Sequence, residues 1–346
     1  MAIKHLSKKY MKSLEASHLP TDEFGRNLRD IRISLTDQCN LRCGYCMPAE
    51  VFNSDYPFLS GQKLLTFDEI AQVVEVFVQC GGKKVRLTGG EPLLRKDVDQ
   101  LIGILKGIQG VEEVALTTNG LLLPKYIDAM VDAGLDRVTL SLDALEDSLF
   151  QKMSGRAVSV RQVLVGIDAA RDAGIPVKVN SVIIRGLNDH QVLPLAEFFK
   201  PRDEILRYIE FMDVGNCNGW AKDQVYSAKE ILSDLTSQYD LEPVGANYVG
   251  EVAKRYRYVD GSGEIGIISS VSQPFCRSCN RARLSADGQL YTCLFASQGH
   301  DLRKVLRSGE DLKSVLANLW TRRKDRYSEL RGGQEEKKIE MSYIGG

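Results

Sequence analysis

Short apolar runs alternate with longer amphipathic segments over residues 31 to 211. The runs are rich in β-branched residues and end at polar or glycine-containing segments, which is typical of strands. Six such runs predict six strands: Ile31–Thr36, Lys84–Thr88, Glu113–Thr117, Arg137–Leu142, Val177–Ile183 and Ile205–Phe211.

Apolar residues at helical spacing predict helices between these strands. The clearest cover residues 67–80, 124–133, 160–173 and 192–199, with Thr66 and Asn188 as expected N-caps. Strands that alternate with helices indicate βαβ units and a parallel sheet with right-handed crossovers. Six units are too few for a closed eight-stranded barrel, so the pattern leaves an open partial barrel or a doubly wound sheet.

The pattern changes after about residue 245. Predicted strands over residues 248–259, 264–269 and 289–294 are joined by the turns Asp260-Gly261 and Asp287-Gly288. We therefore expect a smaller C-terminal α+β segment after the strand-helix part of the chain. The predicted boundaries are an N-terminal extension at 1–23, a barrel domain at 24–245 and a C-terminal domain at 246–346.

Composition limits the classes of partner. The 346 residues carry 45 Lys+Arg against 46 Asp+Glu, with 43% hydrophobic residues, which is typical of a globular protein. Basic residues cluster only locally, at Arg322, Arg323, Lys324 and Arg326, where we expect a solvated helix face. Neither a nucleic-acid partner nor a membrane span is expected, and without a signal-peptide pattern we expect a cytoplasmic protein.

The eight cysteines are grouped, and in a reducing compartment grouped thiols suggest a metal centre. Cys39, Cys43 and Cys46 follow the first predicted strand with the spacing C-x₃-C-x₂-C. A structural zinc site needs four ligands, and no fourth Cys or His is near in sequence. Three thiolates suit a four-iron cluster that has one iron open to a small molecule.

A second group, Cys276, Cys279 and Cys293, has the spacing C-x₂-C-x₁₃-C. Zinc competes better here, because His300 could supply a fourth ligand. No second C-x₂-C pair follows, which argues against a zinc ribbon, but the residues alone leave both a zinc site and an iron-sulfur cluster open. Cys80 and Cys217 have no partners in sequence and are expected to be buried, inert thiols.

Arg281 and Arg283 lie two residues apart beside the second cysteine group. On a strand they would point to the same side and offer forked donors to phosphate oxygens. The chain has no G-x₄-G-K-[ST] loop, so side chains would have to hold any nucleotide triphosphate. A turn at the end of the second strand, Gly89-Gly90-Glu91-Pro92, would let the backbone approach a ligand closely.

The first cysteine motif and the Gly-Gly-Glu-Pro turn resemble the radical S-adenosylmethionine (SAM) superfamily. The second cysteine group, the arginine pair and the terminal Gly345-Gly346 resemble, within it, the GTP 3′,8-cyclases of molybdenum cofactor biosynthesis. The resemblance runs from about Phe24 to the end of the chain. It implies a partial (βα)6 TIM-like barrel with a smaller C-terminal α+β segment. It also implies two 4Fe-4S clusters, one on each cysteine group, and SAM bound at the open iron of the first.

The resemblance also implies a role for individual residues. The residues that would contact SAM are Tyr45, Gly90, Ser141 and Met212. The residues that would contact GTP are Arg32, Arg86, Thr117, Lys178, Arg281, Ala282 and Arg283. The tail residues Gly345 and Gly346 would reach into the active site.

The implied activity is that of a lyase. Reductive cleavage of SAM would give a 5′-deoxyadenosyl radical, and GTP would become (8S)-3′,8-cyclo-7,8-dihydroguanosine 5′-triphosphate. Implied partners are a flavodoxin- or ferredoxin-like electron donor and, downstream, cyclic pyranopterin monophosphate synthase; a homodimer is possible in this family. Two other hypotheses stay open: another radical SAM enzyme, such as a peptide-modifying maturase, and a non-catalytic zinc-binding module.

Overall fold

Six parallel strands form the centre of the computed structural model, which describes residues 19–332 and 337–345. They are β1 (Asp30–Ser34), β2 (Lys84–Thr88), β3 (Glu113–Thr118), β4 (Arg137–Ser141), β5 (Val177–Ile183) and β6 (Ile205–Glu210). All six predicted strands are confirmed, and their ends agree with the prediction within two residues.

Helices connect these strands: α2 (Phe67–Gln79), α3 (Val98–Gly107), α4 (Leu123–Asp132), α5 (Asp147–Ser154), α6 (Val160–Asp172) and α7 (Val192–Phe199). Thr66 caps α2 as predicted, in a reciprocal pair with Glu69. The cap predicted at Asn188 is wrong, because a 3-10 turn separates it from α7. The Asn188 amide instead donates to the carbonyl oxygens of Asp143 and Val182.

The later part of the chain extends the same sheet. Its elements are α8 (Ala228–Thr236), β7 (Leu241–Val244), β8 (Lys254–Tyr258), β9 (Glu264–Ile268), β10 (Arg281–Leu284), β11 (Gln289–Tyr291), β12 (His300–Asp301), α9 (Leu302–Ser308), α10 (Leu312–Thr321) and α11 (Met341–Ile344). The strand predicted over residues 248–259 forms only in its second half, as β8. The short strands β7 and β12 were not predicted.

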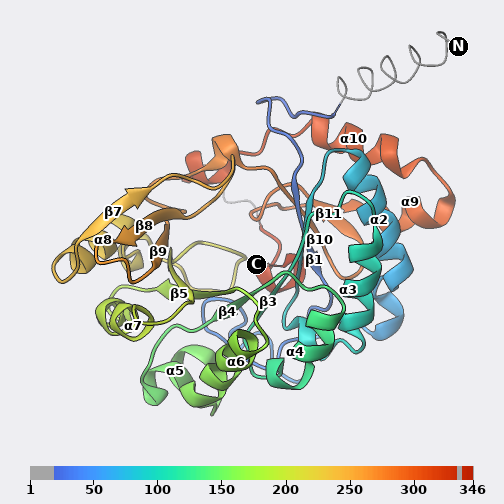
Figure 1. The fold of residues 1–346 in the computed structure, drawn as a ribbon. Coiled ribbons are helices and arrows are strands. Elements are labelled where there is room, and N and C mark those ends of the chain that lie inside the picture. Colours follow the sequence, from blue (N-terminus) through green and yellow to red (C-terminus); the bar gives the residue numbers. More distant parts are fainter. Residues whose placement is uncertain (1–18, 333–336, 346) are drawn as a thin grey trace, which may run out of the picture.

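The twelve strands have the order β12-β11-β10-β1-β2-β3-β4-β5-β6-β9-β8-β7. β10 pairs with β1 and β9 pairs with β6, both in parallel, so the later strands cover both edges of the six-stranded centre (Figure 1). The fold is a partial (βα)6 TIM-like barrel continued by C-terminal strands. No helix in the described residues is long and apolar enough to cross a membrane.

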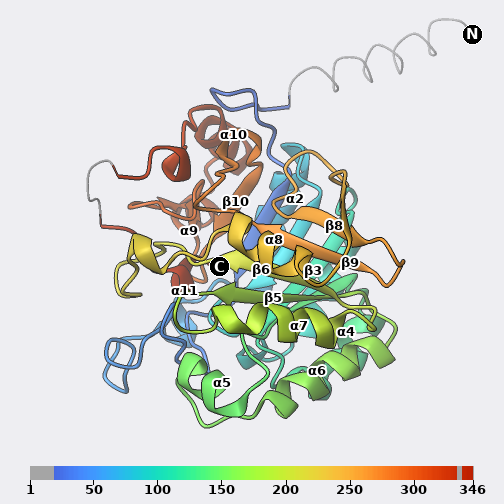
Figure 2. The ribbon, with the colours of Figure 1, turned by 90° about the vertical axis from the view of Figure 1, so that its left-hand side faces the viewer.

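The two faces of the central sheet differ in chemistry. Helices cover the outer face of the sheet (Figure 2). Fully buried side chains of that face, such as Ile33, Leu87 and Leu140, belong to one apolar core with residues of these helices. Alternation along a strand turns the intervening residues to the inner face. There the chain places charged residues such as Arg32 and Arg86, although parallel sheets are usually apolar on both faces. The inner face is therefore where a polar ligand would bind.

Candidate active site

A cavity of about 500 Å³ lies on the inner face of the sheet. Residues of β1 to β6 line it on one side, and residues 247–253, 275–295 and 323–328 contribute from the later part of the chain. Two rows of charged residues cross the strands in this cavity, and their charge balance differs.

The first row lies at the amino-terminal ends of the strands and is neutralised. Asp30, Lys84 and Glu113 are register partners across β1, β2 and β3. The Lys84 ammonium lies 2.7 Å from a Glu113 carboxylate oxygen, and the Arg137 guanidinium lies 2.5 Å from the other. These two cations lower the pKa of Glu113 to about 2, although burial raises it. Opposite charges thus alternate along this row.

The second row lies two residues further along the strands and is entirely cationic. Arg283, Arg32 and Arg86 are register partners across β10, β1 and β2, and all three line the cavity. Neighbouring strands lie only about 4.8 Å apart, so the three guanidinium groups repel one another. Burial and this repulsion lower the pKa of Arg32 well below its ordinary value and that of Arg283 to about 9. A ligand with several negative charges would relieve this repulsion.

Further cations line the cavity on β5 and β6. Burial, with Arg207 and Arg137 nearby, lowers the pKa of Lys178 to about 7. Buried polar atoms without a hydrogen-bond partner among the described residues include Arg207 Nε, Arg137 Nη1 and Asn180 Oδ1. All of these residues line the cavity. Such unsatisfied groups are costly unless a ligand pairs with them.

The first cysteine group lies on the loop after β1. Arg42 fixes this loop, since its guanidinium donates to the carbonyl oxygens of Phe52 at 2.6 Å and Cys39 at 2.7 Å. The backbone N–H of Cys46 donates to the carbonyl of Cys43 at 3.0 Å. Burial raises the pKa of Cys39 to about 11 and raises those of Cys43 and Cys46 further. Metal coordination would remove the protons of these three half-buried thiols.

The Gly-Gly-Glu-Pro turn supports this loop through backbone hydrogen bonds. The N–H groups of Gly90 and Glu91 donate to the carbonyl oxygens of Thr36 and Gln38 at 2.7 and 2.8 Å. The Glu91 carboxylate is 1% exposed and accepts hydrogen bonds from the Thr118 hydroxyl and from two backbone N–H groups. The turn therefore positions the cysteine loop, and Gly90 itself does not line the cavity.

Replacing Gly90 by alanine is expected to displace the cysteine loop. A Cβ at Gly90 would lie 2.2 Å from the Gln38 carbonyl oxygen, whereas a Cβ at Gly44, in the same loop, would meet nothing within 4 Å. We expect Gly90→Ala to lose more than half of the iron bound by the first cysteine group, and Gly44→Ala to keep it. Iron analysis after anaerobic reconstitution checks this, and equal iron in the two variants would contradict it.

Three residues predicted to contact SAM lie together around the cavity. Tyr45, Ser141 and Met212 all line it, as does Thr117 from the predicted GTP set. The Tyr45 hydroxyl donates to Asp143 Oδ2 at 2.7 Å, and Asp143 Oδ1 accepts from the Val182 N–H at 2.8 Å. Asp143 therefore orients Tyr45 in a way that the sequence analysis missed.

The second cysteine group faces the opposite part of the cavity. Cys276, Cys279 and Cys293 all line it. Burial raises the pKa of Cys279, but the guanidinium groups of Arg281 and Arg323 outweigh this and lower it to about 6. The thiolate form that binds metals is therefore favoured at this position.

A zinc ion and an iron-sulfur cluster need different arrangements of cysteine side chains. A zinc ion needs sulfur atoms about 2.3 Å from one point, whereas the cysteines of a cluster bind separate irons. In the described part of the chain, no three His, Cys, Asp or Glu side chains converge on one ion. His300, the fourth zinc ligand considered above, is exposed on β12 and does not line the cavity.

The C-terminal tail enters the barrel between two loops. Lys338 Nζ lies 2.9 Å from Asp213 Oδ2, and Glu340 Oε1 accepts from the Asn216 N–H at 3.0 Å. The Gly345 carbonyl then accepts a hydrogen bond from Arg283 of the cationic row. The structure thus brings Gly345 to the edge of the site, while Gly346 lies outside the described residues.

Some residues lie elsewhere than the sequence analysis expected. Ala282, assigned to the substrate, is buried in the apolar core between the two cavity-lining arginines of β10. Arg323 is 4% exposed and bound to Cys279, so the solvated face predicted for its cluster is wrong there. Cys80 is buried as expected, but Cys217 is only half-buried and donates to Glu340 at 3.1 Å.

Arg207, Asn180 and Arg137 were missed as lining residues. A usable signal existed for Arg207 and Asn180, because a polar residue within a strand buried on both faces is unusual.

Comparisons with known proteins agree with this geometry. A family model described as the Radical SAM superfamily matches residues 33–199, and one described as Molybdenum Cofactor Synthesis C matches residues 205–329. The structure of Streptococcus suis SuiB bound to S-adenosylmethionine superposes with a TM-score of 0.61 at 15% identity, covering 95% of this chain and 75% of SuiB. Fold and cysteine loop therefore define a radical SAM protein, a class that uses SAM and a 4Fe-4S cluster.

Sequence relatives define the family more narrowly. A GTP 3′,8-cyclase from Xanthomonas axonopodis pv. citri (strain 306) is 52% identical over 329 residues, 94% of this chain and 98% of the relative. GTP 3′,8-cyclases from Acidothermus cellulolyticus and Staphylococcus aureus (strain JH9) are 47% and 49% identical, with the same coverage. The chain belongs to the GTP 3′,8-cyclase family.

Proposed function

We propose that the protein is a lyase that converts GTP to (8S)-3′,8-cyclo-7,8-dihydroguanosine 5′-triphosphate, the first step of molybdenum cofactor biosynthesis. The cationic row of Arg283, Arg32 and Arg86 carries this proposal. It lies in one cavity with the second cysteine group on one side and Tyr45, Ser141 and Met212 on the other. A polyphosphate nucleotide placed there would neutralise the row and lie between two cofactor sites.

The residues divide the work by position. Arg32, Arg86, Lys178 and the β10 arginines would bind the triphosphate through charge-assisted hydrogen bonds. Tyr45, Ser141 and Met212 would contact SAM, Gly90 would hold its site from the braced turn, and Thr117 and Ala282 complete the proposed GTP set. When bound, the cluster on Cys39, Cys43 and Cys46 supplies the electron that cleaves SAM. Residues 247–253 and the tail with Gly345 and Gly346 would exclude water from the closed cavity.

Other features of the proposal concern the whole protein. A second 4Fe-4S cluster on Cys276, Cys279 and Cys293 would hold the guanine. The proposed parts are an extension at 1–23, a barrel domain at 24–245 and a C-terminal domain at 246–346. We further propose a cytoplasmic, homodimeric enzyme that takes electrons from a flavodoxin- or ferredoxin-like donor and passes its product to cyclic pyranopterin monophosphate synthase.

The test is anaerobic reconstitution followed by iron, sulfide and SAM-cleavage assays with dithionite, with and without GTP. About eight irons and 5′-deoxyadenosine formation that depends on GTP would support the proposal, since two 4Fe-4S clusters hold that number. About four irons would contradict the proposal of a second cluster, and zinc without iron would support the hypothesis of a non-catalytic zinc-binding module. Eight irons with no response to GTP would favour another radical SAM enzyme; the likeness to SuiB concerns the fold alone and does not itself favour a peptide substrate.

Lys178 predicts how GTP binding depends on pH. Its pKa of about 7 in the unliganded protein would rise beside a triphosphate, so binding takes up a proton. Affinity should therefore be highest below pH 7 and fall by up to about tenfold per pH unit as the pH rises above it. Lys178→Arg keeps its charge over this range, so the decline between pH 7 and 8 should be shallower than in wild type.

Calorimetric titration with GTP in the absence of SAM checks this prediction. The comparison between the two proteins cancels the titration of GTP itself. Lys84, whose pKa burial lowers to about 8, retains part of the pH dependence in both. Equal slopes for wild type and Lys178→Arg would show that Lys178 does not face the triphosphate.

A further inference from the structure

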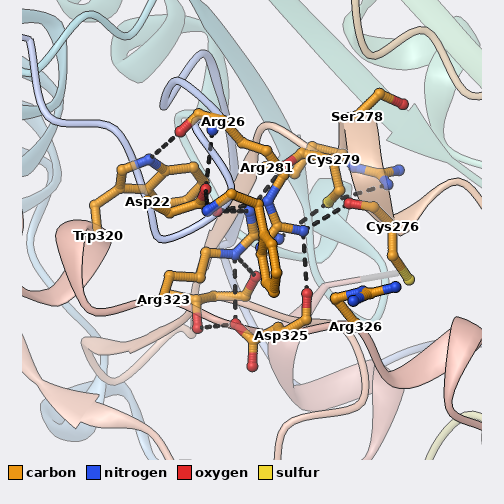
Figure 3. Close-up of polar contacts among 12 residues, drawn as sticks. Asp22, Arg26, Cys276, Ser278, Cys279, Arg281, Trp320, Arg323, Asp325 and Arg326 are labelled. Carbon is orange, nitrogen blue, oxygen red and sulfur yellow. Dashed lines mark hydrogen bonds and ion pairs between the residues drawn. The ribbon is translucent and has the colours of Figure 1, made fainter.

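Arginines from distant parts of the chain enclose the second cysteine group (Figure 3). Arg323 Nη2 donates to the Cys279 sulfur at 3.2 Å, and its Nη1 donates to the Cys279 carbonyl oxygen at 2.7 Å. Arg281 donates to the same sulfur at 3.3 Å. A single sulfur atom therefore accepts hydrogen bonds from two guanidinium groups.

Arg323 is held in this orientation by the protein alone. Its guanidinium lies 3.2 Å from Asp22 Oδ2, donates to the Thr292 carbonyl oxygen at 3.1 Å and stacks over Trp320 at 4.6 Å (Figure 3). Arg26 bridges Asp22 and the Cys276 carbonyl oxygen, so the residues just before β1 also secure the group. The donors to Cys279 are thus in place before any ligand binds.

The first cysteine group has different surroundings. Its arginine, Arg42, donates to carbonyl oxygens rather than to sulfur. The Cys39 sulfur accepts hydrogen bonds from neutral donors, the Leu41 N–H at 3.4 Å and the Asn119 side-chain amide at 4.0 Å. In the described part of the chain, guanidinium groups therefore donate to a sulfur of the second group, and neutral groups donate to a sulfur of the first.

We propose that Arg323 is a positioning residue that, with Arg281, gives a four-iron cluster on the second cysteine group a more positive reduction potential than one on the first. This rests on the proposed function, which assigns a cluster to each group. One added electron gives the cluster and its thiolates one further negative charge, and hydrogen bonds to sulfur and nearby cations stabilise that charge. No bond forms or breaks, and the reductant supplies the electron.

This asymmetry suits a division of roles between the two sites. An electron on a cluster of more positive potential is less able to cleave SAM. The surroundings of Cys279 therefore favour holding a substrate next to the second cluster over supplying the electron for SAM cleavage. The first group, whose Cys39 sulfur accepts hydrogen bonds from neutral donors, keeps the stronger reductant next to SAM.

The test uses the full-length chain with Cys39, Cys43 and Cys46 all changed to serine, so that only the second group binds iron. Its cluster is titrated with dithionite at controlled potential and followed by electron paramagnetic resonance. Arg323→Gln should lower the ratio of reduced to oxidised cluster at a given potential about tenfold, which is about 59 mV for one electron. Asp325→Asn, which removes a carboxylate 3.4 Å from Arg323 Nε, should shift the potential the other way.

Opposite shifts at equal iron content support the proposal, because loosened packing would not reverse sign between the two variants. An unchanged potential in iron-loaded Arg323→Gln overturns it. If that variant binds no iron, Arg323→Lys is measured instead, because lysine keeps the positive charge but lacks the two parallel N–H donors of the guanidinium group. The reduction potential of Arg323→Lys must then lie below that of wild type, and an equal or higher potential overturns the proposal. Absence of iron from the second group in the parent protein would overturn the two-cluster function as well.

Discussion

Replacing Arg32 by methionine is expected to weaken GTP binding about a hundredfold without making the unliganded protein less stable. Hydrogen bonds to a charged partner contribute about 1.5 to 3 kcal/mol each, and loss of about 2.7 kcal/mol changes a binding constant a hundredfold. Arg32 stands in the middle of the cationic row, between Arg283 and Arg86, and would face the triphosphate most directly.

The unchanged or higher stability expected for unliganded Arg32→Met follows from the lowered pKa of Arg32. A base whose pKa is lowered by folding has a charged form that the folded state disfavours. Methionine removes that charge and keeps most of the apolar stem, so the thermal midpoint of the unliganded protein should stay unchanged or rise by a few degrees. GTP should raise the midpoint of wild type more than that of the variant, because a ligand stabilises the state that binds it.

Arg137→Met is the matched control in the same cavity. Arg137 is paired with Glu113 in the neutral row, so its removal breaks an ion pair and leaves a carboxylate with only Lys84. This variant should lower the thermal midpoint and weaken GTP binding less than Arg32→Met. Titration calorimetry and thermal melts with and without GTP measure both quantities. A lower midpoint for unliganded Arg32→Met would show that its charge is compensated in the folded state.

The strand-helix alternation predicted the central fold because the local sequence of each strand is enough to indicate a strand. The strands β1 to β6 combine β-branched residues with clear ends, and helices of sufficient length lie between them. The strands β9 and β10 flank this parallel centre, β9 beside β6 and β10 beside β1. The paired residues lie more than fifty positions apart for β9 and about two hundred and fifty positions apart for β10. No local pattern encodes such a pairing.

Candidate site residues could be predicted where their spacing in the sequence indicates their chemistry. The two cysteine groups and the Arg281, Arg283 pair could be found from the sequence, and the structure places the second cysteine group and that pair on one cavity. Arg137 could not be assigned, because an isolated arginine in a strand can equally face solvent or form an ion pair. Its role depends on which strand lies next to it.

Arg323 illustrates the limit of local charge patterns. In sequence it belongs to a run of four basic residues near α10, which usually forms a solvated face. In the structure, Asp22 provides its buried counterion from about three hundred residues away. Burial of a charge requires such a partner, and the sequence gives no sign that Asp22 supplies it.

Gly345→Ala is expected to lower GTP-dependent turnover about a hundredfold while leaving the iron content unchanged. Gly345 has φ 74°, a conformation that L side chains rarely adopt, and a Cβ there would lie 2.5 Å from Thr88 Cγ2. The tail would have to withdraw from β1 and β2, and Arg283 would lose the Gly345 carbonyl as a partner. Loss of this charge-assisted bond and of the ordered tail together amounts to about 2.7 kcal/mol in the transition state.

The tail's anchors separate this local effect from unfolding. Asp213 and Asn216 hold Lys338 and Glu340, five or more residues before Gly345, and should keep holding them in the variant. Gly103→Ala, a helical position with nothing within 4 Å, is the control for the exchange itself and should keep wild-type turnover. Single-turnover formation of 5′-deoxyadenosine, with GTP affinity measured in parallel, checks the prediction. Turnover within threefold of wild type in Gly345→Ala would show that the tail only covers the cavity, because a group that orients Arg283 during the reaction cannot be displaced without a loss of rate.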